Sequence, residues 1–401
     1  MSSHSLSPTA SVPLLSPTFA PSRAAGGAAL AFAALGAVAV LAGLLWTDGR
    51  RVWAALLVDD FFFLSLALAG ILFLALQYLS SAGWWTVIRR VPEAMMGFVP
   101  VAALLTLPLY FGRQALYPWT RAEVLRHDPT VAAKSAYLNT PFFFARMAAF
   151  LALWTLFALL FRRTSLAQDR AAAGQHRRMV RLSAVFIVTF AVSFSLASFD
   201  WLMSLDPRWF STMFAVYTFA GLLLSGLAAI TLTVVVLRRR GALAGLVQES
   251  HLHDLGKLLF AFSTFWAYIW VCQYLLIWYS NIPEEVTHYV LRARGSWAPL
   301  FYLVPVLSWG VPFLVLMSRS AKRNPRVLQA VAITILVGRW LDLYVLVAPP
   351  VLARVGLGLP ELLITAGYAG LFFFLTARSL SRAPLLARND PYLRESLHHH
   401  S

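Results

Sequence analysis

The sequence predicts an all-α, polytopic integral membrane protein of about ten transmembrane helices. Hydrophobic residues make up 59% of the chain and charged residues only 12%, whereas soluble domains carry about 25% charged residues. The apolar residues also occur in long blocks, and a bilayer span needs roughly 20 mostly apolar residues. These blocks lack the alternation of barrel strands, which are about 10 residues long. Because lipid offers no hydrogen bonds, each block must satisfy its own backbone as a helix.

Ten such blocks follow one another between residues 24 and 377, which we expect to form the membrane domain. The predicted spans are 24–46, 53–80, 94–112, 141–161, 183–203, 211–236, 257–279, 297–317, 327–350 and 360–377.

The segments outside this domain are predicted to be tails. Residues 1–23 are rich in Ser, Pro, Thr and Ala, so they bury too little apolar surface to order themselves. A cleaved signal peptide is the alternative, but the run at 24–46 exceeds a signal core of about 7–15 residues. Residues 378–401 form the C-terminal tail, in which His398, His399 and His400 are expected to be solvated.

The basic residues indicate the orientation of the chain. With ten spans, the two tails and the even-numbered loops share one side of the membrane. That side carries 21 of the 33 Lys and Arg residues, and the opposite loops carry 10. The positive-inside rule places the richer side, with both termini, in the cytoplasm. The net charge of +16 therefore predicts anionic lipid headgroups as partners, and no nucleic acid.

The chain lacks the ligands of a redox centre of its own. Cys272 is the only cysteine, and an iron–sulfur cluster needs about four. The histidines lie in predicted tails or loops, so none is placed to hold a haem within the bundle. No glycine-rich phosphate loop follows a candidate strand, and His251, His253 and Asp254 make only a weak metal motif. We expect no metal, and any electrons would reside on a lipid-soluble carrier or a partner subunit.

Charged residues inside the predicted spans are the positive functional signal. A charge at a helix centre costs roughly 2.5–3.5 kcal/mol on insertion scales, so it should be paired or should face a polar cavity. Arg339 and Asp342 lie well inside span 327–350, and their spacing of three places them on one helix face. They form either a self-neutralising structural pair or part of a proton relay or headgroup site.

Two further spans carry acids near the same side. Asp59 and Asp60 lie about two turns into span 53–80. Adjacent helical residues point about 100° apart, so we expect only one of the two to face the bundle and the other to reach the interface. Asp200 lies within about one turn of the outer end of span 183–203, either as an interfacial acid or as a functional one.

The remaining candidates have similar depths. Gln273 and Tyr274 lie in the outer half of span 257–279, and Glu361 opens span 360–377, where an acid also complements the helix dipole. In the predicted topology all these polar residues fall in the outer half of the membrane. The clustering predicts a half-channel or a pocket for protons or a quinol headgroup that opens to that side. The outer loop 113–140 is the longest and is long enough to dock a peripheral protein.

Several stretches resemble the second large membrane subunit of alternative complex III, a bacterial quinol:cytochrome c (or cupredoxin) oxidoreductase. Together they cover most of the chain from about residue 53 to 350. The resembling stretches are 137–143, 198–212, 253–259, 262–268, 273–279, 281–285 and 339–342. On these residues the chain is similar to the NrfD-like, polysulfide-reductase-type membrane subunits.

The resemblance implies an architecture and partners. It implies two four-helix bundles, about 53–203 and 211–350, flanked by the first and last spans. It also implies a complex in the bacterial cytoplasmic (inner) membrane with a paralogous membrane subunit, a periplasmic iron–sulfur subunit and multihaem cytochrome c subunits. Haem and iron–sulfur clusters would then reside only on those partners, and this chain would contribute quinone binding, proton handling or both.

One departure from the family bears on the quinone role. Related subunits are expected to place a membrane-embedded His and Asp near the quinol, and no histidine lies in a predicted span here. A quinol site would therefore rely on Asp200, Asp59, Asp60 or Asp342. Proton handling or scaffolding beside a paralogue that oxidises the quinol is an equal alternative.

Two other functions share this fold class. A molybdenum-dependent sulfur-compound reductase uses a membrane anchor of the same type, usually with about eight spans. A secondary transporter uses midplane charges and helices broken at corresponding positions of two repeats. Span 297–317 contains Pro305 and Pro312, but we find no matching break in the first half of the sequence.

Overall fold

The computed structural model describes residues 19–170, 174–387 and 389–400, and its described part is almost entirely helical. Nine helices in this part are long and apolar enough to cross a membrane, and a bent helix pair makes ten. The fold class predicted from the sequence is thereby confirmed. The straight spanning helices are α1 (Arg23–Trp46), α2 (Gly49–Leu79), α8 (Thr140–Arg170), α9 (Gln175–Trp201), α10 (Phe214–Arg239), α11 (Glu249–Ser280), α16 (Pro325–Val347) and α17 (Leu359–Ser381). The predicted tail 1–23 lies, up to residue 18, outside the described residues.

Two spans are interrupted. The sequence predicted one helix over 94–112, but the chain forms α3 (Arg90–Met95), α4 (Val99–Leu105) and α5 (Leu109–Leu116), and α5 turns by 70° from the preceding segment. The prediction of a continuous span was wrong because Pro108, which has no N–H to donate, stands at the break. The other interrupted span joins α13 (Ala298–Pro305) to α14 (Val311–Leu316) through a π-helical turn after Pro305.

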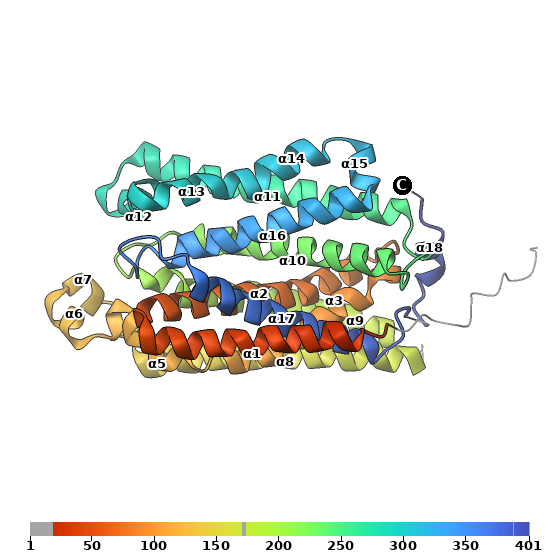
Figure 1. Cartoon of the computed structure of the whole chain (residues 1–401), viewed down its shortest axis with the longest axis horizontal. Helices are drawn as coiled ribbons and strands as arrows, with labels where there is room; N and C mark the ends of the chain where they lie inside the picture. Colours follow the sequence, from red (N-terminus) through yellow and green to blue (C-terminus); the bar gives the residue numbers. More distant parts are fainter. Residues whose placement is uncertain (1–18, 171–173, 388, 401) are drawn as a thin grey trace, which may run out of the picture.

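The helices pack in two groups that share a central seam. Helices α2, α3, α4, α8 and α9 contact one another, as do α10, α11, α13, α14 and α16, and α2 packs directly on α10 across the seam. Helices α1 and α17 pair side by side at the edge of the first group (Figure 1). Gly36 and Gly367 allow this pair to approach closely, since a Cβ on Gly36 would lie 2.6 Å from the Cα of Gly367. Small residues at such contacts are typical of helix packing in lipid.

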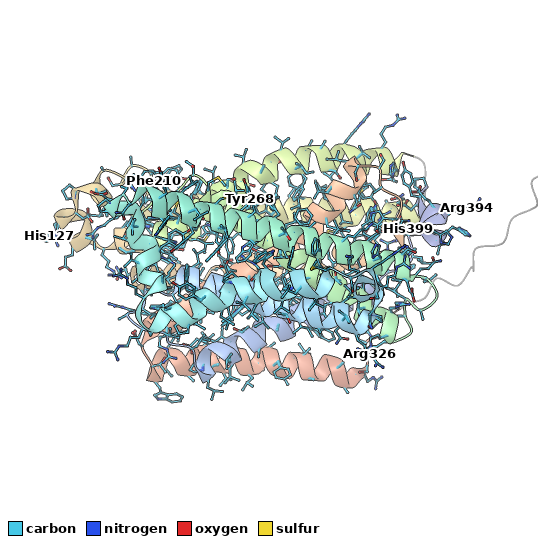
Figure 2. All side chains as sticks on the ribbon, turned by 90° about the horizontal axis from the view of Figure 1, so that it is seen from above. His127, Phe210, Tyr268, Arg326, Arg394 and His399 are labelled. Atoms are coloured by element: carbon cyan, nitrogen blue, oxygen red, sulfur yellow. The ribbon has the colours of Figure 1, made fainter. Side chains whose placement is uncertain are left out.

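The bundle has two distinct ends. One end carries the short helices α6 (Ala122–His127), α7 (Pro129–Ala132) and α12 (Pro283–Ala293), and we call it the loop end (Figure 1). The other carries α15 (Arg319–Arg323), α18 (Leu393–Leu397) and the C-terminus, and we call it the tail end. Figure 2 shows His127 at the loop end and His399 with Arg394 at the tail end.

The C-terminal segment is docked on the tail end. The Ser396 hydroxyl donates to the carbonyl of Trp84 at 2.7 Å, and His399 Nε2 lies 2.5 Å from Asp254 Oδ2. The prediction of a solvated histidine tail was therefore wrong for His399, because the sequence could not show that Asp254 faces it. These contacts connect the C-terminus to both helix groups.

A buried ion cluster reinforces this docking. Arg89 contacts both Glu93 (2.7 Å) and Asp390 (2.6 Å) at the tail end, and all three side chains are almost completely buried. Arg90 also pairs with Glu93 and with Asp169 of α8. The cluster joins α3, α8 and the C-terminal segment, so we assign it a structural role.

Candidate functional site

The intramembrane pair of α16 forms one wall of the candidate site. Arg339 Nη2 lies 2.7 Å from Asp342 Oδ2, and both side chains are buried. The hydroxyl of Tyr217 on α10 donates to Asp342 Oδ1, so the acid is held from a second helix. Asp342 lies five residues before the end of α16, which places it about 8 Å from the loop end of that helix.

The guanidinium of Arg339 is incompletely satisfied. Its carbon lies 4.6 Å from the ring centroid of Trp266 on α11, in a cation–π contact. Its Nε and Nη1 are buried and have no hydrogen-bond partner among the described residues. Gly221 of α10 provides the space for this group, because a Cβ there would lie 2.1 Å from Arg339 Nη2. Buried polar atoms without a protein partner are the atoms that ordered water normally satisfies.

A small cavity lies beside this pair and is lined by helices of the second group and by α12. Its volume is about 30 Å³, enough for about two water molecules, since one needs roughly 10–15 Å³. The lining residues are Phe214, Tyr217, Trp270, Gln273, His288, Tyr289, Arg292, Phe301, Val304, Asp342, Val345 and Leu346. The cavity is too small for a quinol headgroup in this conformation.

Gln273 and Tyr274, both predicted from the sequence, reach this region in different ways. Gln273 lines the cavity and donates from Nε2 to the hydroxyl of Ser211 at 3.2 Å. Tyr274 does not line it, but its ring stacks on Trp270, which does (ring centroids 6.0 Å apart). Tyr274 is therefore a packing neighbour of the site.

Sequence reasoning missed Tyr217, which donates to Asp342, and it also missed two cavity residues of α12, His288 and Arg292. Both were assigned to a loop, but they lie four residues apart on one buried face of α12 and turn into the bundle. Arg292 donates to the carbonyls of His288, Val345 and Leu346 at 2.6–3.0 Å. It thus satisfies the free carbonyls at the end of α16 and complements that end of the helix dipole. The strong amphipathic pattern of 283–293 was the signal that could have revealed this helix.

Burial sets the charge state of the α12 residues. The imidazole of His288 stacks on Trp209, with ring centroids 3.9 Å apart, and its Nδ1 has no hydrogen-bond partner among the described residues. Burial, with a smaller contribution from Arg292, lowers the pKa of His288 well below its usual range. Burial also lowers the pKa of Arg292 to about 10. At neutral pH the cavity therefore faces a neutral imidazole and a charged guanidinium.

The acids of α2 lie at two separate places. Asp59 accepts hydrogen bonds from Trp340 Nε1 (2.7 Å) and the Thr365 hydroxyl (3.0 Å), which connects α2 to α16 and α17. Asp60 accepts one bond from the Thr106 hydroxyl at 2.5 Å. The expectation that one of the two would reach the interface was wrong, because helices pack around α2 on every side and both acids are buried.

Asp200 and Glu361 form closed ion pairs away from the cavity. Arg146 of α8 holds Asp200 through two hydrogen bonds (2.7 and 3.1 Å) and lies over the rings of Tyr137 and Phe142. Arg51 of α2 likewise donates two bonds of 2.9 Å to Glu361.

Glu361 also accepts a hydrogen bond from the backbone N–H of Gly358 at 2.9 Å, so it caps α17 as the dipole argument expected. Its pairing with Arg51 was not foreseen. Asp200 and Glu361 therefore have structural partners for all their charge.

An apolar groove lies at the edge of the first group, between α1, α2, α17 and the break that joins α4 to α5. Its volume is about 340 Å³. The lining residues are Ala33, Gly36, Ala37, Val40, Leu41, Leu56, Leu105, Pro108, Ile364, Gly367, Tyr368 and Leu371. Its wall adjoins Asp60, since Leu56 stands one turn before this acid and Leu105 precedes its partner Thr106. Asp60 Oδ1 is buried without a hydrogen-bond partner among the described residues.

The predicted residues thus divide between several places. The structure brings Gln273 and Asp342 to one cavity, with Arg339 paired to Asp342 beside it, and leaves Asp59, Asp60, Asp200 and Glu361 elsewhere in the bundle. All of them lie in the half of the bundle next to the loop end.

Among the described residues, no three His, Cys, Asp or Glu side chains are grouped so that they could hold a metal ion. Neither a scan against models of protein families nor a search of curated proteins gave a match to this chain.

The pairing of Arg146 with Asp200 predicts a coupled loss of stability. Arg146→Gln or Asp200→Asn leaves one buried group unpaired, which costs about 3–5 kcal/mol. We expect each variant to lower the unfolding temperature in detergent, and the double variant to lose less than the sum of the two. Strictly additive losses would contradict a direct pair.

Neutral His288 predicts a specific response to acid. Its folded pKa lies below the unfolded value of about 6.5, so below that pH the unfolded chain binds the additional proton and stability falls. His288→Gln should therefore narrow the difference in unfolding temperature between pH 7.5 and pH 5.5. The exposed His127 offers the control His127→Gln, which should behave like the wild type. An unchanged difference in His288→Gln would refute the assignment.

Proposed function

We propose that this chain is a membrane subunit of a respiratory quinol:cytochrome c (or cupredoxin) oxidoreductase of the alternative complex III type. In this role it handles protons and carries no redox centre of its own. The observation that carries the proposal is the cavity in which Asp342 meets Tyr217, Gln273, His288 and Arg292. The sequence resemblance across 198–212, 273–279 and 281–285 supplies the choice of complex.

The cavity supports proton transfer more than headgroup binding. It has room for about two water molecules, and water between an acid, a phenol and an amide is a conventional proton path. Asp342 can take up or release a proton there, and Arg339 stabilises its charged form. The cavity lies close to the loop end, so protons would exchange with that side.

The apolar groove beside Asp60 is a second candidate element, and it favours quinol binding. A lateral groove of about 340 Å³ with small and branched side chains accommodates an isoprenoid tail or a ring that enters from the lipid. Asp60, with one unpartnered oxygen, is the nearest base for a quinol proton once the side chains at the groove wall move.

The same proposal assigns the orientation and the partners. The loop end would face the periplasm of a bacterial cytoplasmic (inner) membrane, with both termini in the cytoplasm. The projecting helices α6 and α7 would then offer a docking surface for a periplasmic iron–sulfur or multihaem cytochrome c subunit (Figure 1). A paralogous membrane subunit would complete the complex.

A transporter is less well supported than a respiratory subunit. The first group does contain a broken helix at Thr106–Pro108, which the sequence reasoning had not found. This broken helix is the second spanning helix of the first group, however. The π-helical break after Pro305 lies in the third spanning helix of the second group. Inverted-repeat transporters break at corresponding positions. Purification in mild detergent with associated haem and iron–sulfur absorption would distinguish the complex from a transporter or from a molybdenum-enzyme anchor.

Asp342 provides the direct test of proton handling. In the intact complex in vesicles, Asp342→Asn should slow quinol-dependent cytochrome reduction by about 10²–10⁴-fold, the contribution typical of an acid–base group, or lower the number of protons moved per electron. Asp342→Glu should restore part of the loss. Glu284→Gln, which removes an exposed acid from the loop end outside the cavity and outside α6 and α7, is the control. Normal turnover and normal proton stoichiometry in Asp342→Asn would disprove the role.

The groove can be tested separately by filling it. Ala37 lines the groove, so Ala37→Trp should raise the KM for quinol several-fold and leave the protons moved per electron unchanged. Ala31→Trp adds the same ring at an exposed position of α1 outside the groove and serves as the matched control. Equal KM values for the two variants would remove the groove from the proposal.

A further inference from the structure

A second groove lies at the tail end, far from the candidate site. It is formed where α11 begins, α15 turns and α16 begins, and its volume is about 780 Å³. The lining residues are Glu249, Arg319, Ser320, Arg323, Asn324, Pro325 and Arg326. Figure 2 shows Arg326 on the flank of the bundle, toward the same end as His399.

The groove is strongly basic. Three of its seven lining residues are arginines, and Glu249 is its one acid. Arginine matches phosphate with a planar fork of N–H donors, and it does so better than lysine. The chemistry of the groove therefore selects an anion that carries a phosphate group.

The backbone around the groove is fixed in place. The side chain of Ser318 accepts the Ala321 N–H at 3.1 Å and caps α15, and Asn324 accepts the Arg326 N–H at 2.9 Å and caps α16. Lys322 donates to the carbonyl of Leu316 at 2.7 Å, which holds α14 against α15. The arginines are thus presented by a preorganised turn, which lowers the entropic cost of binding.

The helix that leads into the turn of the groove exposes apolar side chains. Met317 is 62% exposed and Leu314 is 70% exposed on the end of α14 that leads into the turn. An arginine-lined groove whose turn follows a helix with exposed apolar side chains matches an amphipathic ligand, with a phosphate at the arginines and chains along the helix. A free phosphate ion would not need the apolar part.

We propose that this groove binds the headgroup of one anionic phospholipid, with its acyl chains along α14. Basic pockets between membrane helices bind such headgroups, because basic residues near an anionic surface are attracted to it. The site is independent of the proposed proton and quinol chemistry. A bound lipid would fix the depth of this end of the second helix group in the membrane leaflet.

The test measures lipid binding to the full chain in detergent by native mass spectrometry. The probes are phosphatidylglycerol and phosphatidylcholine. The wild type should retain phosphatidylglycerol at least tenfold better than phosphatidylcholine. Arg319→Gln combined with Arg326→Gln should weaken phosphatidylglycerol retention by at least tenfold. Arg177→Gln combined with Arg181→Gln, which removes two exposed charges from the same end on α9, is the matched control and should retain the lipid.

A gain-of-binding variant keeps the proposal testable even if the arginine variant folds poorly. Glu249→Gln removes the acid of the groove and should strengthen phosphatidylglycerol retention. Equal retention by the arginine variant and its control, equal retention of the two lipids, or no gain in Glu249→Gln would each overturn the proposal. Displacement of phosphatidylglycerol by millimolar inorganic phosphate would also overturn it, because the groove would then select a soluble anion.

Discussion

The architecture depends on one constraint: a charge inside the bilayer must find its partner within the protein. Several acids of this chain meet that constraint by joining one helix to another. Asp59 connects α2 to α16 and α17, Asp200 connects α9 to α8, and Glu361 connects α17 to α2. Each acid therefore forms a specific contact between two helices. Such contacts matter in lipid, because apolar contacts alone give helix pairing little specificity there.

The degree to which each acid is satisfied separates structural from functional candidates. Asp200 and Glu361 are fully engaged by arginine forks, and such closed pairs have no remaining group for a proton or a ligand. The Arg339–Asp342 pair is different, because two guanidinium nitrogens have no protein partner among the described residues and a water-sized cavity adjoins the acid. Asp60 also has an unpartnered oxygen. Among the acids predicted to be functional, Asp342 and Asp60 are thus the ones that adjoin both a cavity or groove and buried polar atoms without a partner in the described part of the chain.

The two ends of the bundle differ in chemistry. At the loop end, α12 turns neutral His288 and charged Arg292 inward, so its polar groups serve the interior. At the tail end, arginines gather around the start of α16, and the C-terminal segment is held by the buried cluster around Glu93. In the two proposals, one end exchanges protons with the bundle and the other binds an anionic lipid.

The sequence alone determined the helices and the local pairs. Hydrophobic blocks longer than a bilayer span could form only helices, and a spacing of three placed Arg339 and Asp342 on one face, because both features depend on geometry within a single helix. Tertiary structure decided which distant groups meet. The partner of Asp59 is 281 residues away and that of Glu361 is 310 residues away, and periodicity contains no information on such pairs. The burial of both Asp59 and Asp60 and the inward turn of His288 followed from helices that surround α2 and close over α12, since a side chain's environment in a bundle is set by its neighbours.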